Sequence, residues 1–367
     1  MLLDAGMALT PLDDDADAAE APAADNVDMD ESIYGVETNP VDSKLDLARA
    51  YLDMGDEDGA RPVLLEVIKE GDLAQQAEAR ELFCGWRHPD SLRLSNLPLS
   101  PGARVAARIE YHGGHYHGWQ AQPHLTVPTV QEALEASLQE IAGESVRTTC
   151  AGRTDTGVHG FAQVVHFDDP VGRSLKAWVM GTNRHLPADI RVHWAQEVGE
   201  AFHARFSATA RRYRYIICNT PIRPALLHDL VTWHRHALDI GLMNDAAKTL
   251  LGEQDFSAFR AASCQASSPN RCVTACTITR HCDYVVVDIT ANAFLHHMVR
   301  NIVGSLLAVG SRSSSVEWFE TVLQNRDRAQ AADTAPAEGL YLVDVSYPEA
   351  FGLPETPDGP TLLQGRL

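Results

Sequence analysis

The chain has 367 residues, 45% of them hydrophobic, which is enough for two or three domains with a sizeable buried core. Its net charge is −20, but residues 1–100 hold 23 acidic and 7 basic side chains, a charge of −16, which leaves −4 for residues 101–367 and does not exclude nucleic-acid binding there. No apolar run approaches the roughly 20 residues of a membrane span and the N-terminus lacks a signal peptide, so we expect a cytoplasmic protein without a membrane partner.

The first hundred residues differ in character from the rest. Residues 1–37 are rich in Asp, Glu, Ala and Pro and contain no Lys or Arg, so we expect a disordered acidic tail. Apolar residues recur at helical spacing in three runs within residues 38–84, which predicts a small module made of a helical hairpin and one further helix. Residues 85–102 are interrupted by prolines and predict a linker.

Two short motifs give the helical module a family resemblance. Residues 45–51 (LDLARAY) and 59–61 (GAR) resemble the C-terminal module of FimV-type pilus-assembly proteins, which is similar to part of a tetratricopeptide array. Such a module implies a protein partner, which the sequence does not identify. A helical appendage of no particular family is the alternative.

From residue 103 onward the pattern predicts two similar halves, residues 103–205 and 206–350, and a C-terminal tail, residues 351–367. The first half is predicted as strand 105–111, helix 130–142, strands 146–151 and 161–167, helix 174–185 and strand 190–198. The second is predicted as strand 212–218, helix 238–251, strands 272–281 and 284–291, helices 293–309 and 316–325, and strand 340–347. Both follow the order βαββαβ, with the helix 316–325 as an addition in the second half, so we predict an α+β fold of two ferredoxin-like halves whose antiparallel sheets flank a central cleft.

The loop at residues 152–159 (GRTDTGVH) lies between two predicted strands and combines a carboxylate with a nearby cation. Arg153 can hold Asp155 ionised and aimed, and the glycines let the backbone approach a substrate. An ionised carboxylate in such a loop suits nucleophilic attack. From residue types alone, the alternative is a turn in which this ion pair only ties a hairpin together.

Five motifs, in order, resemble the TruA family of pseudouridine synthases. They are Tyr116-x-Gly118-Trp119-Gln120 and the segments 152–159, 211–215 (RRYRY), 294–304 (FLHHMVRNIVG) and 337–342 (AEGLYL). Two positions depart from the family pattern. His112 stands where an acidic residue is usual, and the loop 263–271 is less basic than expected, which affects RNA contacts rather than the reaction.

The resemblance implies an isomerase: a tRNA pseudouridine synthase that acts as a homodimer, without cofactor or metal, on uridines 38, 39 and 40 of the tRNA anticodon stem-loop. The N1–C1′ bond of uridine breaks, the uracil rotates, and a C5–C1′ bond forms. Asp155 matches the family's nucleophile, which attacks either C6 or C1′. Four further residues match substrate-binding positions of the family. Arg153 matches the arginine that pairs with the nucleophile, and Tyr213 the aromatic that stacks on the target base. Arg300 matches an arginine of the cleft, and Leu340 an apolar contact of the base.

From residue types alone, the candidate residues of the second half can also have purely structural roles. Tyr213 on a strand is an ordinary core aromatic, although its neighbouring arginines suit phosphates: Arg205, Arg211, Arg212 and Arg214. Arg300 on a helix is an ordinary surface ion-pair partner, and on the predicted helix 293–309 it would share a face with His296.

We expect no metal site. Cys272, Cys276, His281 and Cys282 lack the usual Cys-x-x-Cys spacing, the His296-His297 pair is not an H-E-x-x-H motif, and an odd total of seven cysteines suits reduced thiols. Two other function classes are disfavoured. The intact Asp155, Arg153 and Tyr213 argue against an interaction protein that works through the helical module, and the missing ligand cluster argues against a metal-dependent nucleic-acid enzyme.

Overall fold

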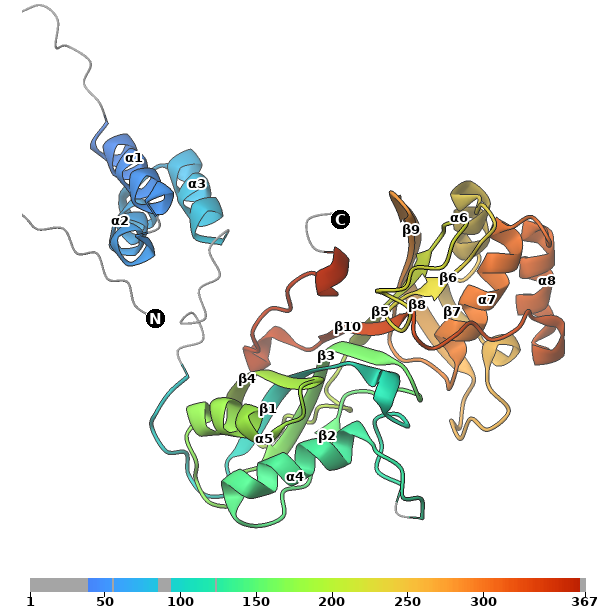
Figure 1. Ribbon diagram of the computed structural model, residues 1–367, viewed down its shortest axis with the longest axis horizontal. Coiled ribbons are helices and arrows are strands. Elements are labelled where there is room, and N and C mark those ends of the chain that lie inside the picture. The colour runs from blue at the N-terminus through green and yellow to red at the C-terminus, as the bar shows by residue number, and fades with distance from the viewer. Residues whose placement is uncertain (1–38, 55, 85–93, 123, 364–367) are drawn as a thin grey trace, which may run out of the picture. The chain divides into compact units, whose positions relative to one another are not determined.

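The computed structural model describes residues 39–54, 56–84, 94–122 and 124–363 (Figure 1). The chain divides into two compact units, Met1–Ser91 and Leu92–Leu367, each with a core of its own. The predicted acidic tail, residues 1–37, lies outside the described residues. Within the described ranges, every helix is too short or too polar to cross a lipid bilayer.

Three helices form the described part of the first unit: α1 (Pro40–Asp53), α2 (Glu57–Glu70) and α3 (Leu73–Cys84). Asn39 and Asp56 cap the first two, because their side-chain oxygens accept hydrogen bonds from backbone N–H groups of the first turn. The apolar positions meet in a small core of Leu45, Ala48, Leu64, Val67 and Ala79. The likeness of this unit to FimV-type modules stays a prediction.

The first half of the second unit has the ferredoxin-like strand order. Its elements are β1 (Arg104–Tyr111), α4 (Val130–Ala142), β2 (Thr149–Cys150), β3 (His159–Asp168), a π-helical turn (Ala177–Gly181) that continues as α5 (Thr182–His185), and β4 (Ile190–Val198). The strands lie in the order β4-β1-β3-β2, and each neighbouring pair is antiparallel. Thr129 caps α4, since its hydroxyl oxygen accepts from the N–H of Glu132, and Gly143 ends α4 in the left-handed conformation at φ 77°.

The second half repeats this order. Its elements are β5 (Ala210–Cys218), β6 (Thr232–Trp233), α6 (Ile240–Lys248), β7 (Gly252–Asp255), β8 (Asn270–His281), β9 (Tyr284–Ala291), α7 (Met298–Gly310), α8 (Val316–Asn325) and β10 (Leu340–Ser346). The order β10-β5-β9-β8 matches β4-β1-β3-β2, again with antiparallel neighbours, so the predicted fold class is confirmed. The short strands β6 and β7 were not predicted.

One parallel pair joins the two halves into a single ten-stranded sheet (Figure 1). β10 runs parallel to the start of β3, with Tyr341 opposite His159 and Leu342 opposite Gly160. β2 pairs with the other end of β3, where Thr149 lies opposite His166. The sequence indicated two sheets but not their continuity, because register between distant strands leaves no local signature. On one side of β3, β10 is thus the neighbouring strand at residues 159–160 and β2 at residues 165–166. The loop 151–158 leaves the sheet between these two pairings.

Residues 95–102, predicted as part of a linker, pack on the first half. The Lys176 N–H donates to the Ser95 carbonyl at 3.2 Å, the Leu99 N–H donates to the Arg173 carbonyl at 3.2 Å, and Leu94 and Leu99 lie against the core beneath α4. The C-terminal segment also returns to the sheet, where Leu363 is buried. The rest of the predicted linker, residues 85–93, lies outside the described residues.

Helix α7 begins at Met298, five residues later than predicted. His297 has φ 61°, a left-handed conformation uncommon for residues other than glycine, and it interrupts the expected helix. His296 and Arg300 therefore do not share a helix face, contrary to the prediction. Apolar spacing in the sequence continues through this break, so periodicity alone misplaced the start.

Candidate active site

A cleft of about 1030 Å³ is lined by residues from both halves. Its walls are the loop between β2 and β3, strand β5, the loop 263–266, and the segment from residue 293 to the first turn of α7. The structure brings all five sequence-predicted site residues into this lining: Arg153, Asp155, Tyr213, Arg300 and Leu340. They come from four separate elements or loops, so the fold rather than chain proximity assembles the set.

The loop that carries Asp155 is held by backbone and side-chain hydrogen bonds. The Trp119 N–H donates to the Thr154 carbonyl at 3.0 Å, and the Thr154 hydroxyl lies 2.8 Å from the hydroxyl of Tyr111. A Cβ atom at Gly118, which has φ 90°, would lie 2.8 Å from the Thr154 carbonyl oxygen. Glycine is thus required for this close approach, which explains why residues 116–120 accompany the loop as a motif.

Gln163 anchors the start of the same loop from inside the sheet. Its side-chain amide donates to the Gly152 carbonyl at 2.6 Å and accepts from the Gly152 N–H at 3.3 Å. Gln163 lies on β3 between the residues paired with β10 and those paired with β2, and it is fully buried. A buried amide satisfied in this way fixes the backbone next to the predicted nucleophile. Sequence reasoning did not single out this residue.

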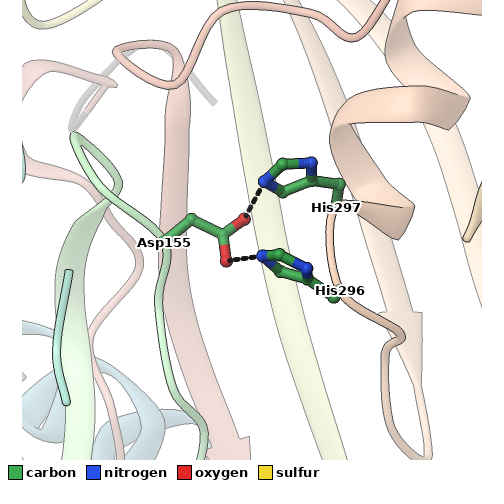
Figure 2. A group of neighbouring side chains, drawn as sticks. All are labelled: Asp155, His296 and His297. Carbon is green, nitrogen blue, oxygen red and sulfur yellow. Dashed lines mark ion pairs between the residues drawn. The ribbon is translucent and has the colours of Figure 1, made fainter. Parts of the chain in front are cut away.

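Three basic groups lie next to the carboxylate of Asp155, and Figure 2 shows the two histidines among them. His296 Nε2 lies 3.2 Å from Oδ1, His297 Nε2 lies 3.5 Å from Oδ2, and Arg300 Nη1 lies 3.9 Å from Oδ2. Burial lowers the pKa of His297, although the charge of Asp155 acts in the opposite direction. The strained backbone of His297 aims its ring at the carboxylate, a pattern frequent at functional sites.

Arg153 occupies a different position from the one expected. Its side chain is exposed on the lining of the cleft. Among the ion pairs of the described residues, those of Asp155 run to His296, His297 and Arg300, and none joins it to Arg153. The prediction paired Asp155 with the arginine nearest to it in the sequence. The arginine that lies next to its carboxylate is instead Arg300 of α7.

Two of the three partners of Asp155, His296 and Arg300, are held by further hydrogen bonds. The Ser263 hydroxyl lies 3.1 Å from Nδ1 of His296, so this ring is held at both nitrogens. Arg300 donates from Nε to the Ala335 carbonyl at 2.7 Å, which directs the outer nitrogens of the guanidinium toward the cleft. Such support restricts where the carboxylate points.

Tyr213 and Leu340 form apolar parts of the cleft. Tyr213 is buried and packs edge-on against Phe294, with ring centroids 5.1 Å apart. Burial, together with the charge of Asp155, raises the pKa of Tyr213, so its phenol is protonated at neutral pH. Leu340 is buried where β10 begins.

The arginines around Tyr213 do not form the phosphate-binding group that the sequence suggested. Arg212 and Arg214 both donate to the carboxylate of Asp288, and Arg214 is buried. Arg211 donates four hydrogen bonds, all to backbone carbonyls, of Ala151, Arg205, Ala208 and Asn292. Only Arg205 of the four is exposed, and it lines the cleft. The side chains of alternate β5 residues turn into the protein, which clustering in sequence does not reveal.

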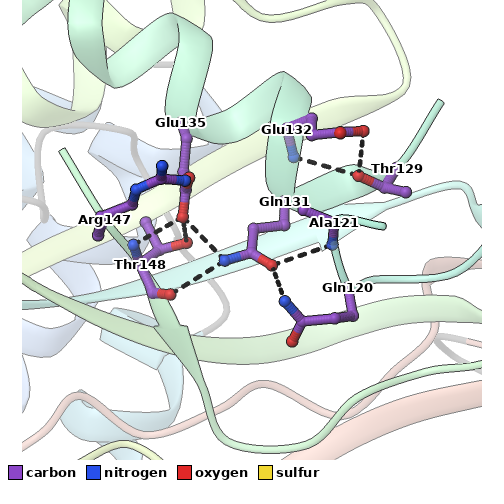
Figure 3. A network of polar contacts seen from close by, with 8 residues as sticks. All are labelled: Gln120, Ala121, Thr129, Gln131, Glu132, Glu135, Arg147 and Thr148. Atoms are coloured by element: carbon purple, nitrogen blue, oxygen red, sulfur yellow. Dashed lines mark hydrogen bonds and ion pairs between the residues drawn. The ribbon is translucent and has the colours of Figure 1, made fainter. Parts of the chain in front are cut away.

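Polar side chains from α4 and its neighbours stiffen the opposite wall (Figure 3). The buried amide of Gln131 accepts from the Gln120 side chain at 2.6 Å and donates to Glu135 at 2.8 Å. Glu135 in turn accepts from the N–H of Thr148 at 2.8 Å. Gln120, Gln131 and Thr148 all line the cleft, so this network fixes the spacing between α4 and the loop that starts after β2.

In the described part of the chain, one group of side chains has the donor atoms and proximity for a metal ion: Asp155, His296 and His297, whose ligand atoms lie within 4.8 Å of one another. Two imidazoles and one carboxylate suit Zn²⁺. Arg300 already provides a positive charge at this carboxylate, so the contacts are those of an ion-pair cluster, and a metal is not required to balance the charge.

Comparison with known proteins gives a consistent set of relatives. The family model described as tRNA pseudouridine synthase matches residues 107–207 and 246–348. Proteins named tRNA pseudouridine synthase A from Vibrio campbellii and Vibrio cholerae are 55% identical over 264 residues, which is 72% of this chain and 99% of theirs. A protein of the same name from Histophilus somni is 55% identical over 260 residues, 71% of this chain and 96% of its own. Among solved structures, a Cbf5–Nop10–Gar1 complex aligns with 71% of this chain and 51% of that chain at 11% identity, with a TM-score of 0.29, too low to carry an argument.

Proposed function

Because the chain belongs to the family of tRNA pseudouridine synthases, we propose that it isomerises uridines 38, 39 and 40 in the anticodon stem-loop of cytoplasmic tRNAs, with Asp155 as the nucleophile. The reaction keeps every atom of the nucleoside except the C5 proton, which exchanges with water. It therefore needs no redox partner or group donor, and we propose that it proceeds without cofactor or metal.

One observation carries this proposal: the carboxylate of Asp155 projects into a cleft lined by both halves and is contacted there by His296, His297 and Arg300. These contacts aim a nucleophile at a base that enters the cleft, and they hold it in place while the uracil detaches and rotates. The target base must first leave its stack, at a cost of a few kcal/mol. Contacts with Tyr213 and Leu340 in the cleft offset part of this cost, and Arg153, exposed on the lining, is placed to contact the RNA backbone.

Tritium release tests the proposal. The full-length protein is incubated, without added metal, with tRNA that carries tritium at uridine C5, next to an Asp155→Asn variant. We expect release by the parent and none by the variant. Asp245→Asn is the matched control, because Asp245 lies on α6 with an exposed side chain paired to Lys248, and it should behave as the parent.

Substrates in which uridines 38, 39 and 40 are replaced singly by cytidine identify the positions. No release from any tRNA with uridines in its anticodon stem would contradict the proposed activity. Release that survives in a folded Asp155→Asn variant would contradict the nucleophile alone. The proposed homodimer is checked independently by sedimentation of the same preparation.

A further inference from the structure

Phe206 is an exposed aromatic side chain in the loop between β4 and β5. It is 77% exposed, and among the Phe, Tyr and Trp side chains that the structure describes it alone is largely exposed to solvent. Aromatic rings usually contribute to cores or interfaces, so an isolated ring in water calls for a physical explanation.

The ring is held in place rather than free to move. Nδ1 of His203 accepts hydrogen bonds from the backbone N–H groups of Arg205 and Phe206, both at 3.2 Å. The imidazole of His203 lies against the Phe206 ring, with centroids 4.3 Å apart and planes inclined by 31°. His203 contacts in turn the buried ring of His166, at 4.7 Å between centroids. A column of three rings thus leads from the core to Phe206 and keeps it presented to solvent.

This loop is tied to the loop that carries Asp155. One nitrogen of Arg211, Nη2, donates to the carbonyl of Arg205 at 2.6 Å and to the carbonyl of Ala151 at 3.0 Å. Ala151 is four residues before Asp155, and Arg205 itself lines the cleft. Phe206 therefore directly follows a residue of the cleft lining, without itself being one of the lining residues.

The charge beside the ring favours one kind of partner. The guanidinium of Arg205 lies 5.7 Å from the centre of the Phe206 ring, is exposed, and takes part in no ion pair among the described residues. Arg153, also exposed, lines the same cleft. An aromatic face next to unpaired guanidinium groups matches a nucleobase and its phosphate, because bases stack on aromatic rings and guanidinium groups bind phosphates.

We infer that Phe206 and Arg205 form a binding subsite for one unpaired nucleobase of the tRNA and its adjoining phosphate, next to the uridine that enters the cleft. This inference rests on the proposed function. The ring supplies a stacking face that does not select a base, and the guanidinium orients the backbone, so the subsite holds the RNA strand while its neighbour turns into the cleft.

Equilibrium binding of unmodified tRNA, labelled with a fluorophore, tests the subsite. All variants are made in the Asp155→Asn background, so that no turnover occurs during the titration. Phe206→Leu keeps an apolar side chain but removes the stacking face, and we expect binding about 10-fold weaker. Phe206→Trp restores a stacking face and should bind within about 2-fold of the parent. Leu226→Ala, at a side chain that is 93% exposed outside the cleft lining, is the matched control and should leave binding unchanged.

The inference is overturned if Phe206→Leu binds as tightly as its parent, or if Phe206→Trp fails to restore the loss. It is also overturned if sedimentation shows that Phe206→Leu separates a dimer into monomers, since the ring would then belong to an interface between copies. Tritium release by the protein with Asp155 intact is measured separately. If the protein is inactive but tRNA binding depends on Phe206, the subsite is supported and the proposed function is contradicted. If the protein is active but binding does not depend on Phe206, only the subsite is contradicted.

Discussion

Nε2 of His296 lies 3.2 Å from Oδ1 of Asp155, and Nδ1 of the same ring lies 3.1 Å from the hydroxyl of Ser263. A ring fixed at both nitrogens holds one carboxylate oxygen in one place. We expect His296→Gln to lower kcat by about 10- to 100-fold, because a small misplacement of a reacting group is costly, while tRNA binding changes little. His236→Gln, at an exposed position outside the cleft lining, is the control. A parent-like kcat in His296→Gln would show that the contact does not position the nucleophile.

Arg211 ties together loops around the cleft, since two of its four hydrogen bonds end on carbonyls just before β5, one on a carbonyl before Asp155, and one on a carbonyl just after β9. A lysine cannot reproduce this fork of donors. We expect Arg211→Lys to lower the free energy of unfolding by about 2–4 kcal/mol, because several hydrogen bonds, two of them part-buried, are lost, and to lower kcat as the loops loosen. Urea unfolding and tritium release measure the two effects. Arg312→Lys, at an exposed pair with Asp239, should cost less than about 1 kcal/mol.

His159, at the start of β3, makes stability depend on pH. The ring is 1% exposed, Nδ1 accepts from the Gly113 N–H at 3.0 Å, and Nε2 donates to the Glu338 carbonyl at 3.1 Å. Protonation would break the first of these bonds. Burial and the neighbouring His112 lower the pKa of His159 to about 4, against the opposing charge of Asp229, and Tyr341 stacks on the ring.

The sign of this effect follows from the lowered pKa. Above about pH 6.5 the ring is neutral in both states, and stability is complete. As the pH falls from about 6.5 to 4, His159 is protonated in the unfolded chain but stays neutral in the folded one. The free energy of unfolding therefore decreases by up to about 3 kcal/mol. Urea unfolding at pH 7.5 and 4.5 measures the change. His159→Asn does not titrate and should lose less stability over this interval than the parent; an equal loss would assign the dependence to other groups.

The cluster of Asp155, His296 and His297 leads to a prediction about metals. Activity should be the same with and without a chelator, because Arg300 already balances the carboxylate. Added Zn²⁺ should inhibit, since the three donors accept it and it would occupy the nucleophile. Inhibition should be reversed by chelator. Loss of activity on chelation alone would contradict a metal-free reaction.

The boundary of the catalytic unit can be tested by truncation. A chain that starts at residue 92 should retain the tritium-release activity and the stability of the parent, because the unit Leu92–Leu367 has its own core. A chain that starts at residue 101 should keep its chemistry but lose stability, since it lacks the backbone hydrogen bonds of Ser95 and Leu99 and the packing of Leu94 and Leu99. Equal stability of the two chains would show that residues 92–100 contribute nothing.

Helices and strands were predicted well where the local sequence pattern alone determines the secondary structure. Helices α4 and α8 and strands β4 and β9 have the predicted bounds. Local signals failed where distant contacts decide. The turn at His297, the pairing of β10 with β3, and the inward direction of Arg212 and Arg214 depend on partners far away in the chain.

The candidate site divides in the same way. The five predicted residues were found through motifs, and all of them line the cleft. The contacts that position them were not predicted, because His296, His297 and Arg211 act on segments that only the fold brings near. The sequence correctly indicated an arginine beside Asp155, but this arginine is Arg300 of α7 and not Arg153.

The parallel pairing of β10 with β3 also determines when, during synthesis, the protein becomes competent. The ribosome delivers β3 and the Asp155 loop long before Leu340–Ser346. Until that last strand emerges, the start of β3 lacks its neighbour and the cleft lacks the wall that Leu340 provides. Contacts between such distant segments form late and slowly. A growing chain thus carries Asp155 before the cleft around it is complete, and the cleft is complete only after Leu340–Ser346 have emerged.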